Sequence, residues 1–487
     1  MINIKDIEPK VLWSHFSDLN TIPRPSKKED RIITFMMNFG QNLGLQTIKD
    51  KVGNVIIKKP ASIGMENHKT IILQSHLDMV HQKNDETKFD FNNQGIEMYV
   101  DGDWVKANGT TLGADNGIGV ASIMAILSST KISHPPLEAL FTIDEETGMT
   151  GAKGIDPSMF DGEILLNLDT EDDDELSIGC AGGIDTNTSF SYNQEPVYRN
   201  AIFIELSVKG LIGGHSGMDI DKGRGNANKF MNRILYHLYS KIQYQLISLR
   251  GGSLRNAIPR ESKAIITVKD NTFETLKIEF NKISEIILKE YRLVETDLFF
   301  KLKKVSNTSN SAIKKAELYN ILNTIYSVFN GVYRMNPSIN GLVETSSNLA
   351  RVVISEGSFT TESLQRSSSE TSKYDIANSI KGAFKSMGCS VIQSGDYPGW
   401  EPNKESAILN IMISIYKDLF CEEPQVKACH GGLECGIFSK HLPNVDMISF
   451  GPNIRGAHSP DEKCQISSVQ KFWKYLLYVL KSVPKKK

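Results

Sequence analysis

Side chains that can bind a metal ion follow an apolar segment in the first part of the chain. His76 and Asp78 come soon after Ile71-Ile72-Leu73, a β-branched run that is typical of a buried strand. Because side chains two residues apart on an extended segment point the same way, both can address one site. A neutral imidazole binds divalent metals well, and a nearby carboxylate can accept its second ring N–H. The pair is equally compatible with a strand-end histidine that makes an ordinary hydrogen bond.

Acidic residues also lie at the ends of other apolar elements. Asp115 precedes a helix-forming run, where it could be an N-cap, but the glycines around it suggest a close backbone approach that a cap does not require. The strand predicted over 137–143 is followed by Asp144, Glu145 and Glu146, which repel one another unless a bound cation compensates them or the loop is solvated.

Two further candidate metal ligands complete the pattern. The strand predicted over 164–168 ends at Asp169, and the one over 445–450 is followed by a loop that carries His458. In open α/β sheets, ligands bind in the crevice outside the carboxyl ends of the strands. One shared site for all these residues is therefore geometrically natural.

Composition narrows the class of protein. The 487 residues are 40% hydrophobic and 23% charged, which predicts a soluble globular protein of two or three domains. The net charge of −2 predicts no overall electrostatic attraction to nucleic acid or to an anionic membrane. No signal or membrane-spanning pattern is found, so we expect a cytoplasmic protein. The six cysteines form no C-x-x-C pair, so any metal is expected on His, Asp and Glu.

The middle of the chain has a different pattern. It predicts strand 202–208, helix 226–241, strands 243–248 and 264–268, helix 274–291 and strand 297–303. The order partly repeats as helix 313–329, strands 341–347 and 350–355, helix 370–387 and strand 390–393. These are two βαββαβ-like halves of an inserted α+β domain over 200–393, within an α/β domain formed by 1–199 and 394–487.

The joint pattern resembles the aminoacylase and carboxypeptidase clan of di-zinc metallopeptidases, and within it the aminoacyl-histidine (cytosolic non-specific) dipeptidases. The resemblance covers almost the whole chain. It is carried by the segments Ile22-Pro23-Arg24-Pro25-Ser26, Ser75-His76-Leu77-Asp78-Met79-Val80, Leu112-Gly113-Ala114-Asp115-Asn116-Gly117, Asp144-Glu145-Glu146-Thr147-Gly148, Gly213-Gly214-His215-Ser216-Gly217, Arg255-Asn256-Ala257-Ile258-Pro259-Arg260 and His430-Gly431-Gly432-Leu433-Glu434-Cys435-Gly436.

The resemblance implies an α/β catalytic domain with a mixed central sheet flanked by helices, an inserted lid domain and a two-metal site. Asp115 should bridge the ions, His76 and Asp169 should complete one, and Glu146 and His458 the other. Asp78 should orient His76, and a cis peptide should follow Asp115. Glu145 should be the general base for a water shared by two ions roughly 3.5–4 Å apart. Zinc is expected, with manganese or cobalt as substitutes.

The implied reaction is hydrolysis of dipeptides with a free amino terminus, including Xaa-His dipeptides, because aspartate at position 169 accompanies dipeptidases and aminopeptidases in this clan. His215 resembles the family residue that stabilises the oxyanion, within one chain or across a homodimer formed through the lid. Arg366, and more weakly Asn256, are our candidates for binding the substrate carboxylate. The role of Glu434 is left open. The alternatives are a related amidohydrolase or tripeptidase, or an inactive metal-binding homologue.

Overall fold

Parallel strands form the centre of the first part of the chain. The computed structural model describes residues 3–306 and 309–486, and its contacts divide the chain into unit 1 (Met1–Gly179, Trp400–Ala428, Leu433–Lys487) and unit 2 (Cys180–Gly399, Cys429–Gly432). The predicted domain boundaries, 199/200 and 393/394, lie inside unit 2. The difference arises because β9 (Gly182–Ser191) pairs with β20 (Ser358–Ser367) and β21 (Ser390–Tyr397) and so belongs to the sheet of unit 2.

The main sheet of unit 1 has the strand order β1-β2-β6-β3-β7-β23-β8-β22. Its strands are β1 (Gln46–Lys49), β2 (Val55–Lys59), β3 (Ile71–His76), β6 (Leu137–Thr142), β7 (Ile164–Asn167), β8 (Glu175–Cys180), β22 (Gln425–Cys429) and β23 (Asp446–Ser449). β3 runs parallel to β6 and β7, and β7 runs parallel to β23. Every residue of β3, β6 and β7 is buried, as expected for strands covered on both faces.

Helices and a smaller sheet complete unit 1. The helices are α1 (Lys10–Asn20), α2 (Asp30–Asn42), α3 (Ala114–Ser128), α4 (Thr150–Lys153), α9 (Ala407–Phe420), α10 (Glu434–His441) and α11 (Ile466–Lys481). β4 (Met98–Asp101) and β5 (Trp104–Ala107) form the hairpin of a second sheet with β24 (Ile454–Arg455) and β25 (Lys463–Gln465). None of the described helices is long and apolar enough to cross a bilayer.

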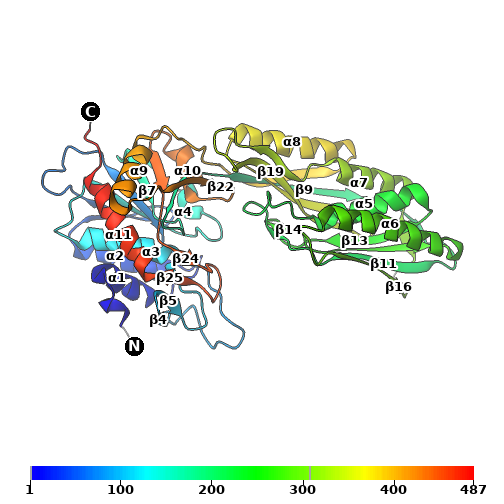
Figure 1. Cartoon of the computed structure of the whole chain (residues 1–487), viewed down its shortest axis with the longest axis horizontal. Helices are drawn as coiled ribbons and strands as arrows, with labels where there is room; N and C mark the ends of the chain where they lie inside the picture. The colour runs from blue at the N-terminus through cyan, green and yellow to red at the C-terminus, as the bar shows by residue number, and fades with distance from the viewer. Residues whose placement is uncertain (1–2, 307–308, 487) are drawn as a thin grey trace. The chain divides into compact units, whose positions relative to one another are not determined.

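The sheet of unit 2 has the order β16-β11-β15-β13-β19-β20-β9-β21. Two small sheets are separate from it: β10 (Gln194–Pro196) pairs with β17 (Ser311–Ile313), and β12 (Gly214–His215) pairs with β14 (Ala257–Ile258). The other strands of the main sheet are β11 (Ile202–Lys209), β13 (Gln245–Gly251), β15 (Ser262–Val268), β16 (Phe299–Val305) and β19 (Val343–Ser355), with β18 (Gly331–Met335) paired to β19. Helices α5 (Ala227–Lys241), α6 (Phe273–Tyr291), α7 (Lys315–Ser327) and α8 (Glu370–Ser386) contribute to one hydrophobic core with this sheet (Figure 1).

Two βαββαβ arrangements meet in this sheet at the pairing of β13 with β19. The second takes its first strand from β9, which precedes the whole first arrangement in sequence. The two strands predicted over 341–347 and 350–355 are wrong, because β19 is one continuous strand. Its register with β20 shifts between Leu349 and Arg351, so the irregularity lies within the strand and does not divide it.

Candidate metal centre

The ligand-type side chains all come from unit 1, most of them from the carboxyl ends of its parallel strands. His76 ends β3, Asp169 follows β7, and Glu145 and Glu146 follow β6. Asp115 lies in the first turn of α3, and His458 lies in the loop between β24 and β25. The carboxyl ends of parallel strands share one edge of a sheet. The fold therefore assembles the predicted residues at that edge.

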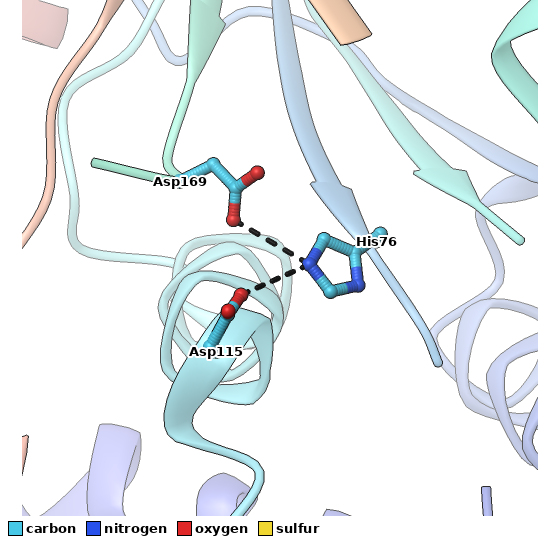
Figure 2. Close-up of side chains that lie close together, drawn as sticks. All are labelled: His76, Asp115 and Asp169. Carbon is cyan, nitrogen blue, oxygen red and sulfur yellow. Dashed lines mark hydrogen bonds and ion pairs between the residues drawn. The ribbon is translucent and has the colours of Figure 1, made fainter. Parts of the chain in front are cut away.

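The first ligand set is centred on His76 (Figure 2). Its Nε2 atom lies 3.1 Å from Asp115 Oδ1 and 3.5 Å from Asp169 Oδ1. Its Nδ1 atom lies 3.1 Å from the carbonyl oxygen of Asp78 and 3.4 Å from Oδ1 of that residue. An Nδ1–H that donates to Asp78 leaves the Nε2 lone pair directed at the two carboxylates, as a metal ligand requires.

The second set is centred on the exposed His458. Its Nε2 atom lies 3.2 Å from Asp115 Oδ2 and 3.0 Å from Glu146 Oε2. Asp115 therefore presents one oxygen to each imidazole, which is the arrangement of a bridging ligand. Asp115 does not act as an N-cap: Gly113 holds that position, and the backbone of Asp115 is non-helical. The expected cis peptide bond between Asp115 and Asn116 is present.

These residues fit a pair of divalent cations. One ring nitrogen carries at most one hydrogen, yet each Nε2 faces oxygens of two carboxylates, which is the arrangement expected around a shared cation. Glu146 Oε1 is buried without a hydrogen-bond partner among the described residues. The donor atoms of His76, Asp115 and Asp169, and those of Asp115, Glu146 and His458, lie within 4.8 Å of one another. Imidazole and carboxylate ligands of this kind suit zinc, manganese and cobalt.

The charges around these side chains also favour a cation. The hydrogen bonds of His458 to Asp115 and Glu146 raise its pKa to about 11. Burial raises the pKa of Glu146, although His458 opposes the shift. Burial would lower the pKa of His76, but the surrounding carboxylates, Asp169 first, raise it well above its ordinary value. The carboxylates therefore favour positive charge at both imidazoles.

Asp78 organises more of the site than the sequence suggested. Besides facing His76, its Oδ1 accepts the backbone N–H of Glu145 at 3.0 Å, and its Oδ2 accepts that of Glu146 at 3.3 Å. The Ser26 hydroxyl donates to Oδ2 at 2.8 Å. Burial alone would raise the pKa of Asp78, but these bonds and His76 lower it below the ordinary value. An ionised Asp78 therefore fixes a ligand and the acidic loop together.

Glu145 lies beside the ligands, and donor atoms of His76, Glu145 and Glu146 also lie within 4.8 Å of one another. Burial is the main cause that raises the pKa of Glu145 well above its ordinary value; the nearby carboxylates add to it and His76 opposes it. A carboxyl group with a raised pKa can hold a proton near neutral pH, which suits a general base that must later act as an acid.

A pair of buried side chains of opposite charge, Glu462 and Arg24, holds the turn that carries Asp115, and no local sequence pattern predicted this role. Glu462 accepts four backbone N–H bonds, from Leu112 and Gly113 to Oε2 (2.7 and 2.9 Å) and from Ala114 and Asp115 to Oε1 (2.8 and 3.2 Å). Its position four residues after His458 was the one available signal.

Arg24 is the positive member of this pair. Its Nη2 donates to the carbonyl of Gly113 at 2.6 Å, and its Nη1 donates to those of Leu77 and Asp78 at 3.1 and 3.2 Å. A Cβ atom on Gly113 would lie 2.5 Å from Nη2, which explains the glycine. Arg24 thus ties the end of the His76 strand to the turn that carries Asp115.

Glu434 lies fully buried at the start of α10. Its Oε2 accepts hydrogen bonds from Gln74 Nε2 at 2.6 Å and from Thr142 Oγ1 at 2.8 Å. Asn167 Nδ2 donates to Gln74 Oε1 at 2.5 Å, and Ser449 hydrogen-bonds to Asn167 in turn. This network joins the strands that carry His76 and Asp169 beneath the site. Burial raises the pKa of Glu434 to about 8.

The residues predicted to bind substrate all lie in unit 2. His215 Nε2 and Arg366 Nη2 are 3.4 Å apart. Asn256 is exposed and contacts this region through its carbonyl oxygen, which accepts the N–H of Ser216 at 2.8 Å. Unit 2 thus brings together His215 and Arg366, and joins Asn256 to them through its backbone.

Comparison with known proteins gives concordant results. The model of peptidase family M20/M25/M40 matches residues 72–482. The chain is 40% identical over 486 residues, 100% of both chains, to the cytosol non-specific dipeptidase of Escherichia coli K12. It is also 40% identical to the aminoacylhistidine dipeptidase of Vibrio alginolyticus, whose crystal structure it matches with a TM-score of 0.93 over 100% of this chain and 99% of the other. The aminopeptidase PepT of Bacillus cereus shares the fold at 15% identity, with a TM-score of 0.56 over 98% of each chain.

Proposed function

Because this chain belongs to peptidase family M20/M25/M40, we propose that it is a two-metal dipeptidase of broad specificity that acts on dipeptides with a free amino terminus, including Xaa-His dipeptides. Membership of the family makes it a metallopeptidase. One observation carries the proposal: Asp115 turns one carboxylate oxygen to His76 and the other to His458. The two full-length relatives, which are named as dipeptidases, support the substrate class.

His76, Asp115 and Asp169 would hold one cation, and Asp115, Glu146 and His458 the other. Bound divalent ions supply Lewis acidity, which polarises a scissile carbonyl and lowers the pKa of a water. We assign zinc to the site because mixed imidazole and carboxylate ligands suit it, with manganese or cobalt as alternatives.

Glu145 would take a proton from the attacking water at its carboxylate and deliver it to the departing amine. Its backbone is fixed by the N–H bond to Asp78, which holds Glu145 beside His76 and Glu146. A purely structural metal site has no use for such a group. Glu145 therefore favours an enzyme over an inactive homologue.

Unit 2 would recognise the substrate through Arg366 and His215. The Nδ1 atom of His215 accepts the N–H groups of Gly217 (3.3 Å) and Met218 (3.1 Å), so its Nε2 carries the hydrogen. Burial, with Arg366 adding to the effect, lowers the pKa of His215 to about 4. A neutral imidazole N–H can stabilise an oxyanion, and the guanidinium of Arg366 suits a carboxylate. A cytoplasmic location accords with the word cytosol in the name of the Escherichia coli relative.

The test is metal analysis together with hydrolysis of Ala-His, Leu-Gly, an N-acetylated dipeptide and a tripeptide. We expect about two metals per chain and cleavage of the unblocked dipeptides. Glu145→Gln should lose activity by several orders of magnitude while it retains metal, whereas the matched surface variant Glu163→Gln, which removes a bridge to Lys69, should behave as wild type.

Other outcomes would select the alternatives. Activity confined to the N-acetylated dipeptide would indicate an amidohydrolase, and activity confined to the tripeptide a tripeptidase. Bound metal without hydrolysis would indicate an inactive homologue.

A further inference from the structure

Arg366 has a neighbour across the sheet of unit 2 that sequence analysis did not identify. Arg366 on β20 is paired with Gly183 on β9, and Gly183 is paired with Tyr397 on β21. Residues in register on adjacent strands lie side by side on one face of a sheet. Arg366, Gly183 and Tyr397 therefore form one row, with a residue that lacks a side chain in the middle.

The missing side chain lets the phenol ring lie across the row. A Cβ atom at Gly183 would lie 2.7 Å from Cε1, Cζ and Oη of Tyr397, and one at Gly432 would lie 3.0 Å from Cε2. With two glycines beside the ring, the Tyr397 hydroxyl reaches Arg366 Nη1 at 2.8 Å.

The backbone of Tyr397 is also fixed. The fully buried Lys373 donates its ammonium group to the carbonyl oxygen of Tyr397 at 2.7 Å. The same group pairs with Glu370 and with Asp396, both at 2.8 Å. Lys373 therefore holds the end of β21 in place, so the phenol is positioned before any substrate binds.

The polarity of the bonds points to an anion. A guanidinium has no acceptor, so the Tyr397 oxygen must accept from Arg366 and its own hydrogen must point elsewhere. Among the described residues no acceptor receives that hydrogen. His215 Nε2–H and Arg366 Nη2–H, 3.4 Å apart, are also both donors. The Tyr397 hydroxyl and His215 Nε2 thus lie beside the Arg366 guanidinium, whose Nε donates to Ser216 Oγ at 3.4 Å. A carboxylate could accept the hydrogens of Tyr397 and His215 and pair with the guanidinium.

We propose that Tyr397 is a specificity-determining residue that donates its hydroxyl hydrogen to the C-terminal carboxylate of the dipeptide while it orients Arg366. This inference rests on the proposed function, in which Arg366 binds that carboxylate. A dipeptide whose carboxylate is converted to an amide offers a weaker acceptor for the phenol and the guanidinium. Tyr397 therefore contributes to selection of free-acid dipeptides over amidated ones.

The test compares Tyr397→Phe with wild type on Leu-Gly and on its C-terminal amide. A hydrogen bond to a charged group corresponds to about a 10- to 100-fold change in affinity. The variant should raise KM for the free acid by that factor, leave kcat within about threefold and leave KM for the amide nearly unchanged. Tyr244→Phe is the matched control, because the buried Tyr244 hydroxyl of unit 2 donates to the carbonyl of Leu235. We call the kcat/KM for the free acid divided by that for the amide the acid-to-amide ratio, and in this control it should equal that of wild type.

Gly183→Ala gives a second reading of the same contact, because its methyl group displaces the phenol while every hydrogen-bonding side chain remains. It should lower the acid-to-amide ratio in the same direction. An unchanged ratio in both Tyr397→Phe and Gly183→Ala, or an equal loss on acid and amide, would overturn the inference while dipeptidase activity stands. A wild-type protein that cleaves no dipeptide would overturn the proposed function, and this inference with it.

Discussion

Replacement of Glu462 by glutamine removes half of the hydrogen bonds that hold the turn carrying Asp115. The change keeps the shape of the side chain but replaces one acceptor oxygen with an amide NH2. That NH2 must face two backbone N–H donors, either those of Leu112 and Gly113 or those of Ala114 and Asp115. Two of the four hydrogen bonds are therefore lost. The two backbone N–H groups that made them then face the amide NH2, which is itself a donor.

The magnitude follows from those two donors. An unsatisfied buried donor costs about 1–3 kcal/mol, so Glu462→Gln should lower the free energy of unfolding by about 2–6 kcal/mol. Measurement at pH 8 keeps the native carboxylate ionised, because burial raises the pKa of Glu462 to about 7. The displaced turn should also weaken the bridging ligand and lower the metal content.

The assay is denaturant unfolding together with metal analysis, and Glu138→Gln provides the control. Glu138 is also buried and accepts the backbone N–H groups of Asp161 and Gly162, but it lies at the opposite end of β6 from Glu145 and Glu146. Both variants should lose stability, and Glu462→Gln alone should lose metal. A Glu462→Gln protein within about 1 kcal/mol of wild type, with full metal occupancy, would refute the reasoning.

Three further outcomes are expected. Asp78→Asn should reduce metal affinity or kcat by about 10- to 100-fold, as is typical for a partner of a ligand, measured by metal titration and initial rates; an unchanged variant would exclude its role in holding the acidic loop. Metal binding should release protons, because hydrogen bonds to Asp115 and Glu146 raise the pKa of His458 to about 11; affinity should rise with pH by about tenfold per unit for each proton released, measured by calorimetry in buffers of different ionisation enthalpy. If unit 2 mediates a homodimer, light scattering should give twice the chain mass of 54.3 kDa, and a monomer would place the role of His215 within one chain.

The grouping of most candidate ligands was predictable from sequence, because they come at or after the ends of apolar strands. One buried apolar strand ends at His76, and two others end shortly before Asp169 and before Glu145 and Glu146. One rule about the carboxyl ends of strands therefore places these residues together. Asp115 was ambiguous, since an acid before a helix is normally a cap. The structure removes the ambiguity because Glu462, from far along the chain, satisfies the amides of that turn instead.

The residues that sequence analysis missed act over distances that no local pattern reveals. Glu462 binds amides more than three hundred residues earlier, and Tyr397 reaches Arg366 only because β9 lies between their strands. β9 lacks a β-branched run and begins with two glycines. For this reason neither the strand nor the start of unit 2 was predicted from the sequence. Pairing with β20 and β21, rather than propensity, places it in the sheet.

The charges at the metal centre indicate how the protein should behave when its metal is removed. Burial raises the pKa of Glu145, Glu146, Glu434 and Glu462, while protonated His76 and His458 compensate Asp115 and Asp169. Protons can therefore replace the cations, and Arg24 and Glu462 hold the turn without any metal. The chelated protein should remain folded by circular dichroism, with a melting temperature that rises when metal is restored. At free metal near one thousand times Kd, one site adds about 4 kcal/mol. A chelated chain that unfolds at 25 °C and neutral pH would show that protons cannot serve in this way.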